Sequence, residues 1–407
     1  MLNLAAMEEA QDHYLRYRRA LGEAPLPAAL VDLDALEANV DRIVAAARGR
    51  KLRLASKSVR SVELMRAIID RARGAVGGLM TYAAAETLWL AQQGFSDLLL
   101  AYPTAHPADA AMLAEANRQA SAAAAVDAVE QVEAIERAAE QAHVRVPLVV
   151  DVDVSYRPLG GVVHLGVRRS PLRSPEEVVA LARRIAGSAS LAFRGVLAYE
   201  AQIAGLPDFV PQEPLRTAAL RAMKSRSRPQ VAAARAAMAH ALREAGLAPA
   251  LFNGGGTGSL ASGPTEEALT EVTVGSGFLC SHLFDHLDGL PLAPAIWFAL
   301  QASRRPAPEM ITCHGGGLIA SGAPGADRLP LPALPAGLTL LPLEGAGEVQ
   351  TPLRVPRGVL VALGAPVFFR PAKAGEPAER FADYALVRGD KQVGRARTYR
   401  GMGQCFG

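Results

Sequence analysis

Residues 52–57 read LRLASK and residues 61–71 read SVELMRAIIDR, a short apolar strand followed by a segment with helical spacing of apolar side chains. Seven further strand-like runs follow, most of them separated by helix-period segments, at 78–82, 97–103, 122–127, 147–154, 191–200, 250–255 and 270–275. Eight strands that alternate with helices are typical of a closed parallel (β/α)8 barrel, of the TIM type. The alternative is an open doubly wound sheet, but no GxGxxG motif follows the first strand.

The chain on either side of this repeat has a different character. Residues 1–24 are predicted to form one amphipathic helix, and a short apolar strand follows at 28–32. From about residue 290 helical periodicity nearly disappears, Pro and Gly become dense, and short apolar β runs recur. We therefore predict a barrel domain over 26–290 and a mostly antiparallel β domain over 291–407, on which the N-terminal segment 1–25 can pack.

The bulk composition limits the classes of function. Of the 407 residues, 50% are hydrophobic and 20% are charged, and the net charge is +3. The sequence has no basic stripe with interleaved aromatic residues, so nucleic-acid binding is disfavoured. No apolar run reaches the roughly 18 residues that span a bilayer, and the acidic, amphipathic N-terminus does not resemble a signal peptide. Three cysteines, Cys280, Cys313 and Cys405, are widely spaced, so we expect no disulfide framework and a cytoplasmic protein.

The residues at the carboxyl ends of the barrel strands are the first candidates for chemistry, because active sites of barrels lie there. Lys57 ends the first barrel strand and is expected to point into the barrel mouth, partly desolvated, where a neutral amine can form a Schiff base. The alternative is a solvated loop lysine beside Arg53 and Arg60. Tyr199 and Glu200 end the sixth barrel strand.

Two glycine-rich turns follow the seventh and eighth strands. Residues 253–259, NGGGTGS, and residues 275–277, GSG, offer backbone N–H groups without interfering side chains, together with several hydroxyls. Barrels often bind phosphate with these two loops, whereas either turn alone is also compatible with a flexible loop. An amine facing a phosphate site suits pyridoxal 5′-phosphate, whose aldehyde needs a lysine and whose phosphate needs an anchor.

Five segments of the chain resemble the fold-type III pyridoxal-phosphate proteins, and in particular the D-threonine aldolase/D-serine dehydratase group, which is related to alanine racemase. They are PAALVDLDALEANVDRI (27–43), LRLASKSVRS (52–61), GLMTYAAAETLWLAQQGFSDLLLAYP (78–103), GVLAYE (195–200) and NGGGTGS (253–259). The resemblance covers residues 26–280 and continues more loosely beyond them. It implies a Schiff base on Lys57, a barrel with a C-terminal β domain, and a head-to-tail homodimer in which the partner's β domain closes the site.

The same resemblance implies the remaining residues of the site. It places Tyr199 near the cofactor, and it assigns the phosphate to Gly255, Gly256, Thr257, Gly258, Gly275 and Ser276. His164 stands where the group commonly has an Arg, and we include it among the cofactor-binding candidates. Metal-dependent members carry a His and a Cys or Asp two apart late in the β domain. Here Pro371 and Lys373 occupy those positions, so we expect no metal and, at Lys373, a fixed positive charge or a second base.

Asp151 and Asp153 alternate with apolar residues in the fifth barrel strand and should point to one face of it. Charged residues in the interior of a protein are unusual without a role. A role in the barrel mouth and an ion pair with Arg157 or Arg168 are both open.

Several histidines and one cysteine are further candidates. His282 and His286 have the i, i+4 spacing of metal ligands, although a structural pair near a dimer interface is favoured. His314 is a candidate general acid or base, with a buried, hydrogen-bonded histidine as the alternative. Cys405, near the C-terminus, is a candidate for reaching a partner's active site.

These features predict a pyridoxal-phosphate-dependent enzyme, and the resemblance implies a lyase that cleaves a D-configured β-hydroxy amino acid to glycine and an aldehyde. Its catalytic residues are expected to be Lys57, His314, Tyr199 and Lys373. Alternatives with the same fold are a D-serine or D-amino-acid dehydratase and an amino-acid racemase. The non-enzymatic alternative is a pyridoxal-phosphate homeostasis protein, but those single-barrel proteins lack a second domain.

Overall fold

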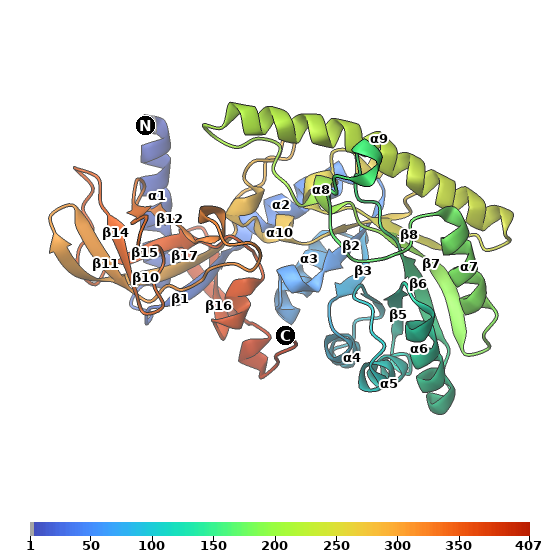
Figure 1. Cartoon of the computed structure of the whole chain (residues 1–407). Helices are drawn as coiled ribbons and strands as arrows, with labels where there is room; N and C mark the ends of the chain where they lie inside the picture. The colour runs from blue at the N-terminus through green and yellow to red at the C-terminus, as the bar shows by residue number, and fades with distance from the viewer. Residues whose placement is uncertain (1–3) are drawn as a thin grey trace.

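The computed structural model describes residues 4–407, and eight of its strands close into a parallel barrel (Figure 1). The barrel strands are β2 (Lys51–Ala55), β3 (Val76–Thr81), β4 (Asp97–Leu100), β5 (Ser121–Val126), β6 (Val146–Asp151), β7 (Leu191–Ala198), β8 (Leu251–Gly254) and β9 (Glu271–Val274). The ring closes where β2 pairs in parallel with β9, with Leu54 opposite Val274. The predicted (β/α)8 barrel is confirmed, and its eight strands are the eight predicted runs.

Helices cover the outside of the barrel. They are α2 (Leu33–Ala46), α3 (Val62–Arg71), α4 (Ala84–Gln92), α5 (Pro107–Ala116), α6 (Val129–Ala142), α7 (Pro175–Ala186) and the long α9 (Pro214–Glu244). The short helices α8 (Ala201–Ala204) and α10 (Ser276–Leu279) lie instead at the carboxyl ends of β7 and β9. The sequence sets their starts: Ser61 caps α3, and Ser174 forms a capping box with Glu177 ahead of α7. None of the helices within residues 4–407 combines the length and the apolar character needed to cross a bilayer.

The barrel interior has an apolar layer and a charged layer. Alternate residues of β5 illustrate the first, because Ala123 and Ala125 pack inside while their neighbours face the helices. The charged layer is formed by Arg53, which is 1% exposed and donates to Glu271 at 2.5 Å and to Asp97 at 3.0 Å. Burial of one guanidinium between two carboxylates fills one end of the barrel and leaves the other end for chemistry.

The second unit is a nine-stranded sheet whose strands pair antiparallel except for β1 with β16. Its strands are β1 (Ala28–Asp32), β10 (Ile296–Ala307), β11 (Met310–His314), β12 (Leu331–Leu334), β13 (Thr339–Leu340), β14 (Gln350–Arg354), β15 (Pro366–Arg370), β16 (Asp383–Arg388) and β17 (Lys391–Arg397). The predicted antiparallel β domain is thus present. β1, which we had grouped with the barrel segment 26–290, lies in this sheet between β10 and β16.

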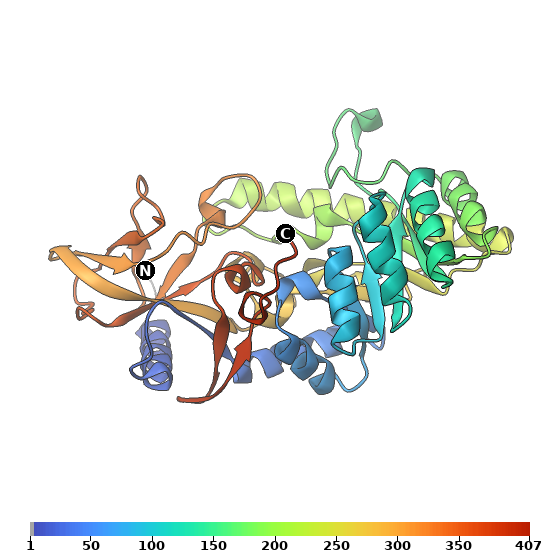
Figure 2. The same cartoon turned by 90° about the horizontal axis from the view of Figure 1, so that it is seen from below.

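The two ends of the chain tie the units together. Helix α1 (Leu4–Leu21) packs on the sheet, where the ring of Tyr17 lies 5.4 Å from that of Trp297 and 5.7 Å from that of Phe368. The C-terminal segment lies against the barrel, with the ring of Tyr399 5.0 Å from that of Trp89 on α4. Seen from below, the C-terminal end accordingly lies between the sheet and the barrel (Figure 2).

Candidate active site

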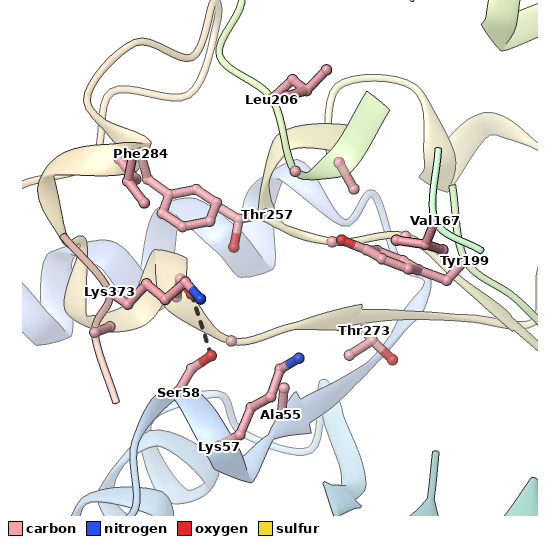
Figure 3. A pocket seen from close by; sticks show the side chains of 18 of the residues that line it. Ala55, Lys57, Ser58, Val167, Tyr199, Leu206, Thr257, Thr273, Phe284 and Lys373 are labelled. Atoms are coloured by element: carbon pink, nitrogen blue, oxygen red, sulfur yellow. Dashed lines mark hydrogen bonds between the residues drawn. The ribbon is translucent and has the colours of Figure 1, made fainter. Parts of the chain in front are cut away.

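A cavity of about 820 Å³ opens at the carboxyl ends of the barrel strands, and both units line it. The barrel contributes Lys57, Tyr102 and Tyr199, and the loops of the second unit contribute Ser321 and Lys373. Figure 3 shows the amines of Lys57 and Lys373 and the ring of Tyr199 turned towards one space. This is the position at which barrel enzymes carry their active sites.

Lys57 lies in the short 3-10 turn η1 (Ser56–Ser58) that directly follows β2. Its Nζ donates a hydrogen bond to Tyr102 Oη at 2.7 Å. The turn is held from below by buried Ser56, which donates to the Met80 carbonyl at 2.9 Å. The side chain of Lys57 is exposed, so the partial desolvation that we expected is not found, because the cavity is open to solvent.

Arg169 is a functional candidate that the sequence did not single out. Its guanidinium lies in the cavity 5.7 Å from the ring centre of Tyr102 and 5.6 Å from that of Tyr199, a distance at which a cation is attracted to an aromatic face. Burial, with the nearby Glu200 carboxylate, raises the pKa of Tyr199 to about 12. Tyr199 therefore keeps its proton at neutral pH and can act there as a hydrogen-bond donor.

The two glycine turns meet at one side of the cavity and form what we call the phosphate cup, Gly255, Gly256, Thr257, Gly275 and Ser276. Close packing requires glycine at two of these positions: a Cβ on Gly255 (φ +85°) would lie 2.4 Å from Val272 Cγ1, and one on Gly275 would lie 2.6 Å from Ser58 Oγ. Thr257 and Ser276 begin η3 (Thr257–Ser259) and α10, so their N–H groups have no acceptor within these helices.

The donors of the cup fit a phosphate group, because N–H groups and hydroxyls converge where glycines let the ligand approach the backbone. Ser58 Oγ lies 3.3 Å from Ser276 Oγ and adds a hydroxyl that the sequence did not reveal. Gly258, which we had included, does not line the cavity. It packs on the backbone instead, since a Cβ there would lie 2.6 Å from the Ala204 carbonyl oxygen.

Asp151 and Asp153 have different environments although they face the same way. Asp153 forms 2.5 Å ion pairs with Arg157 and with Arg173, which we had not named. Its burial opposes ionisation, but the hydrogen bonds from Ser155 and the charge of Arg173 outweigh burial and lower its pKa. Asp151 lines the cavity and forms no ion pair within residues 4–407.

The carboxyl of Asp151 can take up or release a proton near neutrality. Burial, reinforced by the charge of Asp127, raises its pKa to about 7. The positive charge of Arg169 acts in the opposite direction and is outweighed.

Lys373 reaches the cavity from the loop after β15. Its Nζ donates to Ser321 Oγ at 2.5 Å and lies 3.5 Å from Glu376 Oε1, and the Ser321 hydroxyl donates to the same carboxylate at 2.5 Å. Lys373, Ser321 and Glu376 thus form a connected set that holds the amine facing Lys57. Across the described residues, no three His, Cys, Asp or Glu side chains are grouped to hold a metal ion.

His314 and His164, which the sequence analysis placed in the site, do not line this cavity. His314 ends β11, inside the second sheet between β10 and β14, and its side chain is exposed. His164 lies in the loop after β6, where its Nε2 is 3.2 Å from the Val167 carbonyl oxygen. The loop turns Val167 rather than His164 towards the cavity (Figure 3).

His282 and His286 both line the cavity but are engaged separately. Burial lowers the pKa of His282, whose Nε2 lies 2.9 Å from the Leu329 carbonyl oxygen. The His286 ring lies 4.8 Å from that of Phe209, with an angle of 49° between the ring planes. Their contacts are those of structural side chains. Cys405 is exposed and does not line the cavity.

Residues 31–280 match the family described as alanine racemase, N-terminal domain. The chain belongs to this family. Among curated relatives, 3-hydroxy-D-aspartate aldolase of Paracoccus denitrificans (strain Pd 1222) is 26% identical over 240 residues, which is 58% of this chain and 56% of that protein. D-threonine aldolase of an Arthrobacter species is 27% identical over 302 residues, 73% of each chain.

Solved structures of the family have the same fold over almost the whole chain. D-threonine aldolase from Filomicrobium marinum superposes with a TM-score of 0.77 at 19% identity, covering 94% of this chain and 96% of that one. D-threo-3-hydroxyaspartate dehydratase from Delftia sp. HT23 superposes at 0.72 with 20% identity, covering 93% and 98%. Family members of the D-threonine aldolase type use pyridoxal phosphate, and the chain is accordingly an enzyme with this cofactor.

Proposed function

We propose that this enzyme cleaves a D-configured β-hydroxy amino acid between Cα and Cβ, giving glycine and an aldehyde. One observation carries the proposal: the amine of Lys57, the phosphate cup and the amine of Lys373 face a single cavity. The names of the aldolases from Paracoccus and Arthrobacter support the same class of reaction.

In this proposal Lys57 binds the carbonyl carbon of pyridoxal phosphate, and the phosphate cup binds its phosphate. The bound cofactor supplies an electron sink for bonds at the substrate Cα. Tyr102, which accepts a hydrogen bond from Lys57, orients the amine. Arg169 places a positive charge over the Tyr102 and Tyr199 rings and favours anionic groups beside them.

Lys373 is proposed to bind the β-hydroxyl of the substrate. Cleavage between Cα and Cβ needs the hydroxyl proton to leave, and a cation beside the oxygen stabilises the charge that develops. Ser321 and Glu376 hold the Lys373 side chain in place through the 2.5 Å hydrogen bonds described above. Asp151, with a pKa of about 7, is a second group that can exchange a proton with the substrate.

The second candidate is dehydration of the same substrates to a 2-oxo acid and ammonia. The dehydratase from Delftia, which has this fold over 93% of the chain, favours it. In that reaction the Cα proton leaves first, and Asp151, with a pKa of about 7, is a group in the cavity that can accept it.

The test is product analysis with D-threonine and D-3-hydroxyaspartate, using their L-enantiomers as controls. The proposal predicts equal amounts of glycine and aldehyde from the D-substrates and none from the L-substrates. A 2-oxo acid with ammonia would assign the dehydratase reaction instead. Bound cofactor with no product from either substrate would point to a homeostasis protein and contradict lyase activity.

We also propose a cytoplasmic homodimer. The free, widely spaced cysteines suit a reducing compartment, and the family resemblance implies a partner that closes the cavity. Light scattering after size-exclusion chromatography should give twice the 42.7 kDa chain mass, and the monomer mass would contradict the dimer.

A further inference from the structure

Behind the phosphate cup lies a buried cluster of one guanidinium and two carboxylates. Arg235, on α9, is 0% exposed. Its Nη1 donates to both carboxylate oxygens of Glu266 at 2.8 Å, and its Nη2 donates to the Ala198 carbonyl at 2.6 Å and to Glu200 Oε2. Glu200 directly follows the end of the barrel strand β7 and is 1% exposed. The cluster therefore links α9 to the barrel rim.

The same Glu200 oxygen also holds the backbone of the cup. Gly255 N–H donates to Glu200 Oε2 at 3.0 Å. The backbone at Gly254 and Gly255 is tightly packed against its neighbours. A Cβ on Gly254 would lie 2.5 Å from Arg235 Nη2, and a Cβ on Gly255 would lie 2.4 Å from Val272 Cγ1. The residue after this hydrogen bond, Gly256, lines the cavity.

The cluster is placed to fix geometry and not to attract an anion. It holds two carboxylates for one guanidinium, so it adds no net positive charge beneath the cup. Burial and the nearby Glu200 carboxylate raise the pKa of Glu266 more than Arg235 lowers it, which indicates the crowding of negative charge there. The cluster is therefore not suited to attract an anion by its charge. It is suited to hold the hydrogen-bond donors of the cup in place.

We propose that Glu200 is a positioning residue for the cofactor phosphate. Its carboxylate, fixed by Arg235, holds Gly255 N–H and so keeps the N–H and hydroxyl donors of Thr257 aimed into the cup. The inference rests on the proposed function, since it takes pyridoxal phosphate as the ligand. Its specific consequence is that Glu200 matters for the phosphate and not for the aldehyde end of the cofactor.

The test compares two ligands on cofactor-free protein, pyridoxal phosphate and pyridoxal, which differ in the phosphate. Glu200→Leu removes the acceptor, and Glu200→Gln keeps an oxygen for Gly255 N–H. Loss of a hydrogen bond to a charged group corresponds to about a tenfold change in Kd or more. We expect Glu200→Leu to weaken pyridoxal phosphate by about that factor and pyridoxal by less than about threefold. Glu200→Gln should restore most of the difference.

Equal weakening of both ligands, or of neither, would overturn the inference. Glu244→Leu, on the exposed end of α9, is the matched control and should leave both Kd values unchanged. If Glu200→Leu does not fold, Arg235→Lys provides the same comparison, because it keeps the charge but loses the planar fork. A wild-type protein that binds neither ligand would contradict the proposed function itself, so the two failures can be told apart.

Discussion

Asp151→Asn tests the charge state assigned to a buried carboxyl of the cavity. Asp151 is 7% exposed, and burial together with Asp127 raises its pKa from 3.8 to about 7. A folded pKa above the unfolded value means that the folded state binds the proton more tightly, so stability falls as the pH rises from about 4 and levels off above about 7. The two pH units between 5 and 7, at about 1.36 kcal/mol each, give about 3 kcal/mol.

The assay is urea unfolding of cofactor-free protein at pH 5 and pH 8. The chain has two tryptophans, so in a Trp297→Phe background the fluorescence of Trp89 on α4 reports the barrel. Asp151→Asn should raise the free energy of unfolding at pH 8, relative to its effect at pH 5, by about 3 kcal/mol. An effect equal at both pH values would refute the reasoning. Asp153→Asn, whose pKa is lowered, is the control and should destabilise at both.

Two further substitutions have matched controls. Tyr399→Phe removes the 2.9 Å hydrogen bond to buried Glu86 and should lower the free energy of unfolding by about 1–3 kcal/mol. Its control, Tyr384→Phe, removes a buried hydroxyl that has no partner in residues 4–407 and should lower that free energy only slightly; equal losses in the two variants would contradict the role given to the Tyr399 hydrogen bond. Lys373→Met should lower turnover by about tenfold or more and leave the Kd for pyridoxal phosphate unchanged. Its control, Lys391→Met, replaces an exposed lysine of β17 and should change neither turnover nor Kd. A loss of cofactor affinity in Lys373→Met would show that Lys373 acts on the cofactor.

The barrel could be predicted because each of its strands is a compact apolar run. Strands buried on both faces need such runs, and β4 and β5 are examples. The place of β1 could not be predicted, since residues 28–32 have the same apolar character. Its partners are residues 296–299 and 385–387, far along the chain, and nothing local specifies such pairing.

Some residues of the site could likewise be predicted from the sequence and others could not. Lys57 and the glycine turns follow from strand ends and from backbone geometry, which sequence patterns report. Arg169 could not be distinguished from its neighbour Arg168, because the loop after β6 has no regular period. His314 stands at a strand end, but only the pairing of the second sheet shows that this end does not line the cavity.

Borohydride reduction of the protein with bound pyridoxal phosphate, followed by peptide mapping, tests the central claim most directly. Reduction fixes the cofactor to the amine that holds it. We predict one modified peptide, containing Lys57, and loss of the absorbance expected at ~410–430 nm in Lys57→Ala. Modification of Lys373 or of any other lysine in place of Lys57, or no modification of the wild type, would contradict the account.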